Sequence, residues 1–290
     1  MKAEINNTAR VATVGDSRPK IGARDSTGVA VAERECSGGA LIVNADDWGY
    51  DCETTDRILD CVNSNALSSV SAMVFMADSE RAAEIARSRG VDAGLHLNLT
   101  VSFSKNDLPC VLRDHQTRVT KFLRMRRLSR VIFHPGLTRS FEYVISAQLE
   151  EFARIYGSAP QRIDGHHHMH LCPNVVLAGL LPAGTISRRN FTFVPGEKSW
   201  GNRFFRASLD RMIQRRHRIA DFFFALAPIE PHARLAKIFN LAKNHTVEVE
   251  THPVNSPEFN FLTRGGLQEL LEGTQIARSF DLVKHSPEWK

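Results

Sequence analysis

Short apolar segments alternate with helical patterns along this chain, and this alternation restricts the fold more than any other feature. Residues 40–45 form an apolar run that predicts a strand buried on both faces, and Ile58, Leu59 and Val62 follow at helical spacing. Further strands are predicted at 70–76, 91–99, 162–164, 246–250 and 280–283, and further helices at 79–90, 140–156, from Pro173 and at 266–271. This order predicts an α/β fold with a parallel sheet, either open or closed into a barrel.

Length and composition limit the domain organisation. The chain has 290 residues, of which 42% are hydrophobic and 24% are charged, so wholesale disorder is excluded. Residues 1–38 show no sustained periodicity and are predicted to be a disordered or flexible extension, whereas residues 39–290 are predicted to form a single domain. The stretches 100–139 and 184–244 are expected to be irregular segments that decorate one end of the scaffold.

The sequence carries none of the patterns that mark a membrane-spanning or secreted chain. The longest uncharged apolar candidate, 222–229, is far shorter than the roughly 18 residues that span a bilayer. The opening residues lack the basic-then-apolar order of a secretory signal. Five cysteines without a CxxC pair are typical of reduced thiols. We therefore expect a cytoplasmic protein.

Positive charge is concentrated in two segments of the sequence. Residues 113–130 carry seven Lys or Arg against one Asp, and residues 201–220 carry six Arg against one Asp. No nucleic-acid reading module accompanies them, so no nucleic-acid partner is expected. Solvated helix faces or loops are the simplest interpretation, and attraction of an anionic substrate or membrane surface is the alternative. Because the second segment runs into three phenylalanines at 222–224, peripheral membrane association or a lipid-linked substrate stays open.

Four polar clusters stand where predicted strands end. They are Asp46-Asp47, His96, the run 164–170 with four histidines, and His252 followed by a proline. The carboxyl ends of parallel strands form the rim where active sites of α/β proteins are assembled. We therefore expect these clusters to meet, although they are far apart in the sequence.

The run 164–170 favours a metal site. In an extended segment His166, His168 and His170 would project to one side, and two imidazoles at i and i+2 can reach one divalent ion. One Asp and two His leave open positions for water and substrate, which is typical of a catalytic ion. The second Asp could then act as general base on the water, and a histidine on the opposite side could protonate a leaving amine. These parts suit amide hydrolysis.

The same motifs resemble those of the YdjC-like carbohydrate deacetylases. The resemblance rests on residues 44–49 (Asn-Ala-Asp-Asp-Trp-Gly), 94–100, the Asp-x-His-x-His-x-His run and His252-Pro253, and it covers roughly residues 40–286. It implies a distorted TIM-like (β/α) barrel of about seven parallel strands with helices outside, and an enzyme that removes an N-acetyl group from an amino sugar, releasing acetate. By this resemblance the metal ligands are Asp47, His96 and His166, the base is Asp46 and the acid is His252. Asp164, His168, His170 and Asn98 would orient the ligands or contact the substrate.

Two departures from the family pattern concern the substrate and the acid. Val254 stands where the family usually has a glycine after the His-Pro pair, and residues 101–105 replace a short acidic loop. Such loops shape a sugar pocket, so the identity and length of the N-acetylated glycan stay open. The ion also stays open, because Asp plus two His suits zinc while a water-filled shell suits magnesium, manganese or cobalt.

Two other functions compete with deacetylation. A metal-dependent phosphoesterase would use the same histidines, with the basic segments attracting phosphate, but a two-metal centre needs more carboxylates than the motifs supply. A non-catalytic carbohydrate-binding member of the fold would explain the departures but not the complete ligand set. A homodimer is the default expectation for the assembly.

Overall fold

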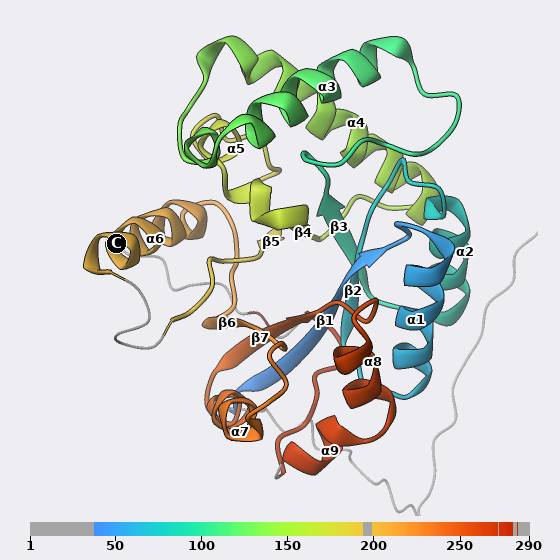
Figure 1. Ribbon diagram of the computed structural model, residues 1–290, viewed down its shortest axis with the longest axis vertical. Helices are drawn as coiled ribbons and strands as arrows, with labels where there is room; N and C mark the ends of the chain where they lie inside the picture. Colours follow the sequence, from blue (N-terminus) through green and yellow to red (C-terminus); the bar gives the residue numbers. More distant parts are fainter. Residues whose placement is uncertain (1–37, 194–198, 272, 281–282, 284–290) are drawn as a thin grey trace, which may run out of the picture. The chain divides into compact units, whose positions relative to one another are not determined.

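Seven parallel strands form one curled sheet in the computed structural model, which describes residues 38–193, 199–271, 273–280 and 283 (Figure 1). The strand order is β5-β4-β3-β2-β1-β7-β6, and every neighbouring pair is parallel. The strands are β1 Ala40–Trp48, β2 Ser69–Ala72, β3 Ala93–Leu97, β4 Arg162–Gly165, β5 Ile186–Ser187, β6 Phe222–Ala225 and β7 Thr246–Thr251. This half-barrel surrounded by helices confirms the expected TIM-like α/β fold.

Helices follow most of the strands and lie outside the sheet (Figure 1). They are α1 Cys52–Asn63, α2 Ser79–Arg89, α3 Cys110–Met125, α4 Thr138–Tyr156, α5 Pro173–Val176, α6 Trp200–Gln214, α7 His232–Leu241, α8 Ser256–Thr263 and α9 Gly266–Leu270, with short 3₁₀ turns η1 Arg127–Arg130, η2 Pro135–Leu137 and η3 His166–Leu171. Local sequence sets several of these ends. Asp51 accepts a hydrogen bond from the backbone of Thr54 at the start of α1, and Gly90 and Gly157 end α2 and α4 in the left-handed conformation, as predicted.

Three predictions about secondary structure were wrong. The stretch 100–139 contains α3, and the stretch 184–244 contains α6, α7 and two strands, so neither is irregular. Their helices were missed because their basic outer faces obscure the apolar periodicity. Phe280 lies outside any strand, and Ile276 instead forms an isolated parallel bridge with Leu41. Apart from Gly38, the predicted extension 1–38 lies outside the described residues.

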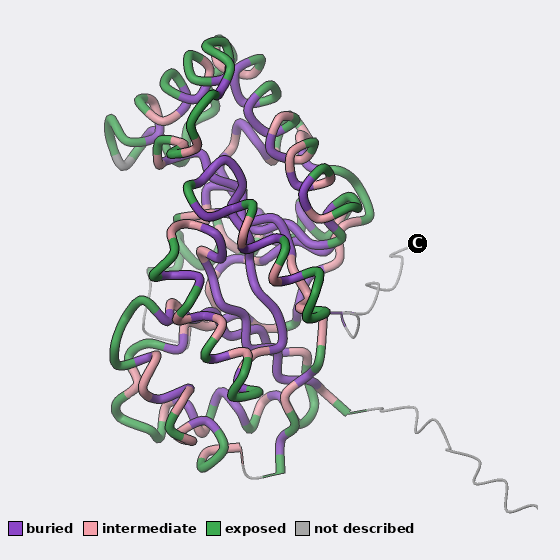
Figure 2. The backbone as a smooth tube through the Cα atoms, turned by 90° about the vertical axis from the view of Figure 1, so that its right-hand side faces the viewer, coloured by how far each residue is buried: buried purple, intermediate pink, exposed green. Residues whose placement is uncertain are grey.

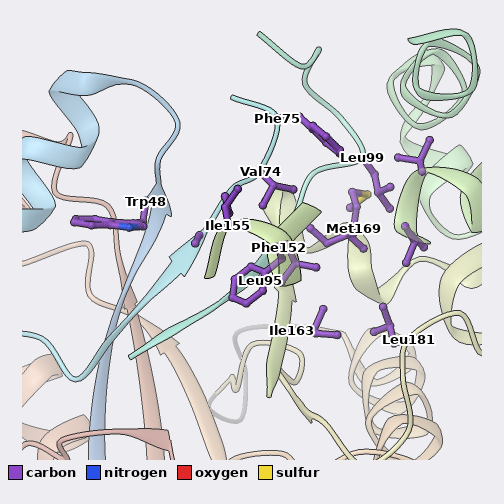
Figure 3. Packing of buried hydrophobic residues seen from close by; sticks show 14 of the residues in the cluster. Trp48, Val74, Phe75, Leu95, Leu99, Phe152, Ile155, Ile163, Met169 and Leu181 are labelled. Atoms are coloured by element: carbon purple, nitrogen blue, oxygen red, sulfur yellow. The ribbon is translucent and has the colours of Figure 1, made fainter. Parts of the chain in front are cut away.

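Two apolar cores hold helices against the outer surface of the sheet. The larger joins β2, β3 and β4 to α2, α3 and α4, where Phe152 and Ile155 of α4 pack with Leu95 and Ile163 of the strands (Figure 3). The smaller joins β1, β6 and β7 to α7, α8 and α9. The strands are buried along most of their length, whereas the helices alternate between buried and exposed residues (Figure 2). Burial on both faces explains why the strands appear as short apolar runs.

The described residues all belong to one compact unit, Cys36–Lys290. Among them, no helix is both long enough and apolar enough to cross a bilayer.

Candidate metal centre

The ends of β1, β3 and β4 bring three predicted ligand residues together. Nδ1 of His166 lies 2.8 Å from Oδ1 of Asp47, and Nε2 of His96 lies 3.3 Å from the same oxygen. One ligand atom from each residue lies within 4.8 Å of the others. Ligands that are each about 2.1 Å from a single ion lie at comparable separations. The three side chains can therefore hold one divalent cation.

A local irregularity of β1 separates the directions of the two adjacent aspartates. The register between β1 and β2 shifts between Ala45 and Trp48, and Asp47 adopts φ 70°, a left-handed conformation that aspartate tolerates better than most residues. As a result the Asp47 carboxylate contacts His166, whereas the Asp46 carboxylate contacts Arg188. The two carboxylates thus have different partners, although they are neighbours in the sequence.

The other ring nitrogen of His96 holds the ring in an orientation that suits a metal ligand. Its Nδ1 lies 2.7 Å from Oδ1 of the buried Asp164, which fixes the ring orientation and directs Nε2 toward Asp47. Nε2 is buried and makes no hydrogen bond, and it lies 3.3 Å from Oδ1 of Asp47. A buried polar atom without a partner costs stability, so an ion at this place would complete the coordination of Nε2. The residues present therefore fit a metal.

The electrostatics of the cluster also favour a cation at His96. Burial alone would lower the pKa of His96, but the nearby carboxylates of Asp46 and Asp164 outweigh it and raise the pKa to about 10. Burial would likewise raise the pKa of Asp47, but its hydrogen bond with His166 and the neighbouring His96 imidazole hold it well below its usual range. Surplus negative charge around Nε2 thus attracts a proton or, with greater charge, a metal ion.

Arg188, which directly follows β5, is a central residue of the site that the sequence motifs did not reveal. Its guanidinium donates to both oxygens of Asp46 at 2.7 and 2.8 Å, lies 3.0 Å from Asp164, and donates to Glu248 at 2.6 Å and Glu250 at 3.3 Å. These carboxylates raise the pKa of Arg188 well above its usual value, although burial opposes them. The alternation of two glutamates with valines in β7 was the one available signal, since it places both carboxylates on one face.

A second group with metal-ligating side chains comprises Asp46, His96 and Asp164. Arg188 already places its positive charge between the two carboxylates, at 2.8 Å from Asp46 and 3.0 Å from Asp164. Nδ1 of His96 is also engaged with Asp164. This position is therefore filled by a protein cation, and the described residues offer one metal position rather than two.

The histidine run is not extended, so the expectation that three of its histidines share a side was wrong. It forms η3, in which His167 and His168 adopt φ of 55° and 57°. His168 Nε2 lies 3.7 Å from Glu250, and its ring packs edge-on against Phe191. His170 Nε2 instead lies 3.0 Å from the backbone oxygen of Arg188. Burial lowers the pKa of His168 to about 3 and that of His170 to about 4, so both are neutral at pH 7.

His252 and Asn98, the last two predicted site residues, differ in their contacts: His252 lies near Asp46, whereas Asn98 contacts the loop after β3. His252 follows β7, is 34% exposed, and places Nε2 4.0 Å from Oδ2 of Asp46. Its backbone N–H donates to Glu258, which holds the loop. Asn98 is buried and directs its side chain at the loop after β3, where its Nδ2 donates to the backbone oxygen of Val101. The contacts described for Asn98 are with this loop, Met76 and Gln148, and none is with the three proposed ligands.

Comparison with known proteins identifies the family. The family described as YdjC-like protein matches residues 40–273 of the chain, a segment that includes every residue of the site. The chain belongs to the YdjC-like family. This confirms the resemblance that the motifs indicated.

Curated relatives of the YdjC-like chain carry deacetylase names. It is 30% identical over 169 residues to the carbohydrate deacetylase of Mus musculus, covering 56% of this chain and 52% of the relative. It is 32% identical over 168 residues to that of Homo sapiens, covering 56% and 50%. A chitooligosaccharide deacetylase of Yersinia pestis (strain Pestoides F) is 31% identical over 136 residues, covering 47% and 52%. The chain thus spans about half the length of the curated relatives it matches.

A solved structure shares the architecture. The chain matches a crystal structure from Enterococcus faecalis V583, described as a candidate cellobiose-phosphate cleavage protein, with a TM-score of 0.59. The match covers 82% of this chain and 97% of that one at 18% identity. At this identity the likeness shows the fold alone.

Proposed function

We propose that this YdjC-like chain is a metal-dependent hydrolase that removes the N-acetyl group from an amino sugar or N-acetylated glycan. The observation that carries the proposal is Nε2 of His96, a buried nitrogen without a hydrogen-bond partner that lies beside Asp47 and His166. The deacetylase names of relatives from mouse, human and Yersinia point to the same reaction. Asp47, His96 and His166 are the proposed ligands of one divalent ion, either zinc or magnesium, with manganese and cobalt as alternatives.

A divalent ion at this site supplies an acidified water and polarises the amide carbonyl. Asp164 contributes by holding the His96 ring in the orientation that presents Nε2. His96 is buried and Asp47 and His166 are only slightly exposed, and such partial exclusion of water strengthens the interaction of these side chains with a cation.

Asp46 is the proposed base. Its carboxylate remains ionised because Arg188 donates to both of its oxygens, and this pairing holds its pKa below the usual range against the opposing effect of burial. An aspartate so stabilised is a weak base, so it can accept a proton only from a water that is already acidic. Its Oδ2 lies 3.9 Å from Nε2 of His96, and this short distance to a proposed ligand supports the role of base.

His252 is the proposed acid. It is the most exposed member of the group and follows β7, which adjoins β1 on the side away from β3 and β4. Its partial exposure lets it face the leaving nitrogen of a bound sugar, and its 4.0 Å separation from Oδ2 of Asp46 lets the two groups act on one substrate. A proton donated at Nε2 converts the departing nitrogen into a neutral amine.

The decisive experiment measures metal content and acetate release together. The purified chain is assayed against N-acetylglucosamine and its oligomers, with elemental analysis of the same sample. Asp47→Asn and His166→Gln are expected to lose the metal and to reduce acetate release by at least about 100-fold, with unchanged circular dichroism. His252→Gln is expected to keep the metal and to lower kcat by about 10²- to 10⁴-fold.

A matched control removes a histidine elsewhere. His232 is exposed on α7, where its ring pairs with Glu230, so His232→Gln is expected to keep both metal and activity. Bound metal without acetate release from the whole panel would contradict the proposed reaction. Full acetate release from metal-free protein would contradict the proposed role of the three ligands.

A further inference from the structure

A cleft of about 340 Å³ opens beside the histidine run, and two basic segments form its walls. Its floor includes His167 and His168, one wall includes Arg130 and Val131 at the end of η1, and the other includes residues of α6 such as Phe205. Segments that are about 70 residues apart in the sequence thus line one cleft. We call residues 124–133 and 200–215 together the basic rim.

The basic rim carries most of the large hydrophobic side chains that the described surface exposes. Nine of the thirteen such side chains lie in it, including Trp200, which is 80% exposed, and Leu128, which is 65% exposed. The nine are Met125, Leu128, Val131, Ile132, Phe133, Trp200, Phe204, Phe205 and Met212. Soluble proteins rarely gather exposed apolar groups in this way unless the surface contacts something.

Positive charge is interleaved with these apolar groups. The basic rim contains eight arginines and one acidic residue, Asp210, which is buried and engaged with Arg189 and Asn190. Within the described part of the chain, none of its exposed arginines makes an ion pair. They are Arg124, Arg126, Arg130, Arg203, Arg211 and Arg215. The surface is therefore both apolar and strongly cationic.

The scaffold holds α6 so that its aromatic face points outward. Leu209 and Ile213 on the inner face pack with Leu171 and Ile219, and Asp210 ties the helix to the segment after β5. On the outer face the rings of Trp200 and Phe204 stack with centroids 5.7 Å apart. The phenylalanines 222–224, by contrast, form β6 at the edge of the sheet and are not among the large hydrophobic side chains that are exposed.

We propose that the basic rim is a docking surface for an anionic lipid bilayer. Aromatic and aliphatic side chains enter the headgroup region while arginines pair with lipid phosphates, and a helix with this division of residues lies in the membrane interface. A nucleic acid would use the aromatic rings and arginines but leave the aliphatic Met125, Leu128 and Ile132 without a partner. A second copy of the chain would bring two cationic surfaces together, which is unfavourable.

Vesicle binding tests this proposal without depending on the deacetylase reaction. The full chain is sedimented with vesicles of phosphatidylglycerol and phosphatidylcholine, and with vesicles of phosphatidylcholine alone. Binding is expected only to the anionic vesicles and is expected to weaken as the salt concentration rises. Each cation near an anionic leaflet contributes about fivefold in affinity, so the triple variant Arg124→Gln, Arg203→Gln, Arg211→Gln is expected to bind roughly 100-fold more weakly.

A second triple variant removes the same net charge elsewhere. Arg87, Lys243 and Arg264 are exposed on other elements, so their replacement by Gln is expected to leave binding within about fivefold of the original. Trp200 gives a local signal, since its emission is expected to shift to the blue on binding and this shift is expected to vanish in Trp200→Phe. Trp48 is fully buried, and Trp289 is replaced by Phe in every protein that is compared, so the shift reports on Trp200.

Four results would overturn the proposal. They are no sedimentation with anionic vesicles, an equal loss of binding in both triple variants, an unchanged Trp200 emission on binding, and binding of the basic rim to RNA or to a second copy of the chain in place of vesicles. If the chain binds anionic vesicles but releases no acetate, the docking proposal is supported and the proposed deacetylase reaction is contradicted.

Discussion

Replacing Arg188 with methionine removes the buried positive charge that joins four carboxylates. Asp46 loses both of its guanidinium donors, at 2.7 and 2.8 Å, and Asp164 and Glu248 lose contacts at 3.0 and 2.6 Å. Methionine keeps much of the apolar stem but loses the guanidinium, whose Cζ lies 5.0 Å from the centroid of the Phe223 ring. The perturbation is therefore mainly the loss of the buried charge and its hydrogen bonds.

The loss of folding stability in Arg188→Met depends on which of the four carboxylates remain ionised. Burial raises the pKa of Glu248 and Glu250, so these two can shed their charge when Arg188 is gone. Asp46 and Asp164 are the pair whose pKa values Arg188 holds low against the effect of burial. Leaving a buried charge without its partner costs about 3–5 kcal/mol. We expect a loss of at least about 4 kcal/mol at neutral pH, out of a total near 5–15 kcal/mol.

Urea unfolding followed by circular dichroism, with a chelator present throughout, measures this loss apart from any metal effect. Arg188→Lys keeps the charge but cannot form paired hydrogen bonds with a carboxylate, and its free energy of unfolding is expected to fall by about 2 kcal/mol. This variant still tests the reasoning if the methionine variant does not fold. The exposed Arg87→Met is the matched control and is expected to stay within about 0.5 kcal/mol. A loss below about 1 kcal/mol for Arg188→Met would refute the reasoning.

Three further predictions address the metal site and the packing around it. Zinc or magnesium at about 100 times its Kd is expected to stabilise the fold by about 2.7 kcal/mol in a thermal melt, and Asp47→Ala is expected to abolish this stabilisation; an unchanged shift would place the ion elsewhere. Asp164→Asn is expected to weaken metal binding about 10- to 100-fold in competition with a chromogenic chelator, because the His96 ring loses its orienting carboxylate. Gly94→Ala is expected to cost about 1–3 kcal/mol in urea unfolding, since the added Cβ would lie 2.6 Å from Cζ of Arg162; a neutral result would mean that the guanidinium moves freely.

The sequence by itself determined the order of strands and helices from β1 to β3, and it also located α4, β4 and β7. Strands that are buried on both faces appear in the sequence as short apolar runs, and Gly90 and Gly157 mark the ends of two helices. Both features are local, so they can be predicted without knowledge of tertiary contacts. The grouping of Asp47, His96 and His166 could also be predicted, because each of these proposed ligands lies at the end of a strand or directly after one. Helices α3 and α6 were missed because exposed arginines and apolar groups share their outer faces.

Only the tertiary structure decided how the motifs are used. The left-handed turn of His167 and His168 separates three histidines that alternate in sequence, because η3 must return the chain toward α5. Arg188 carries no local pattern, and its importance arises where β1, β4 and β7 direct carboxylates into one buried space. Contacts across 60 to 142 residues depend on which strands become neighbours, and no window of sequence contains that information. The placement of two basic segments around one cleft has the same origin.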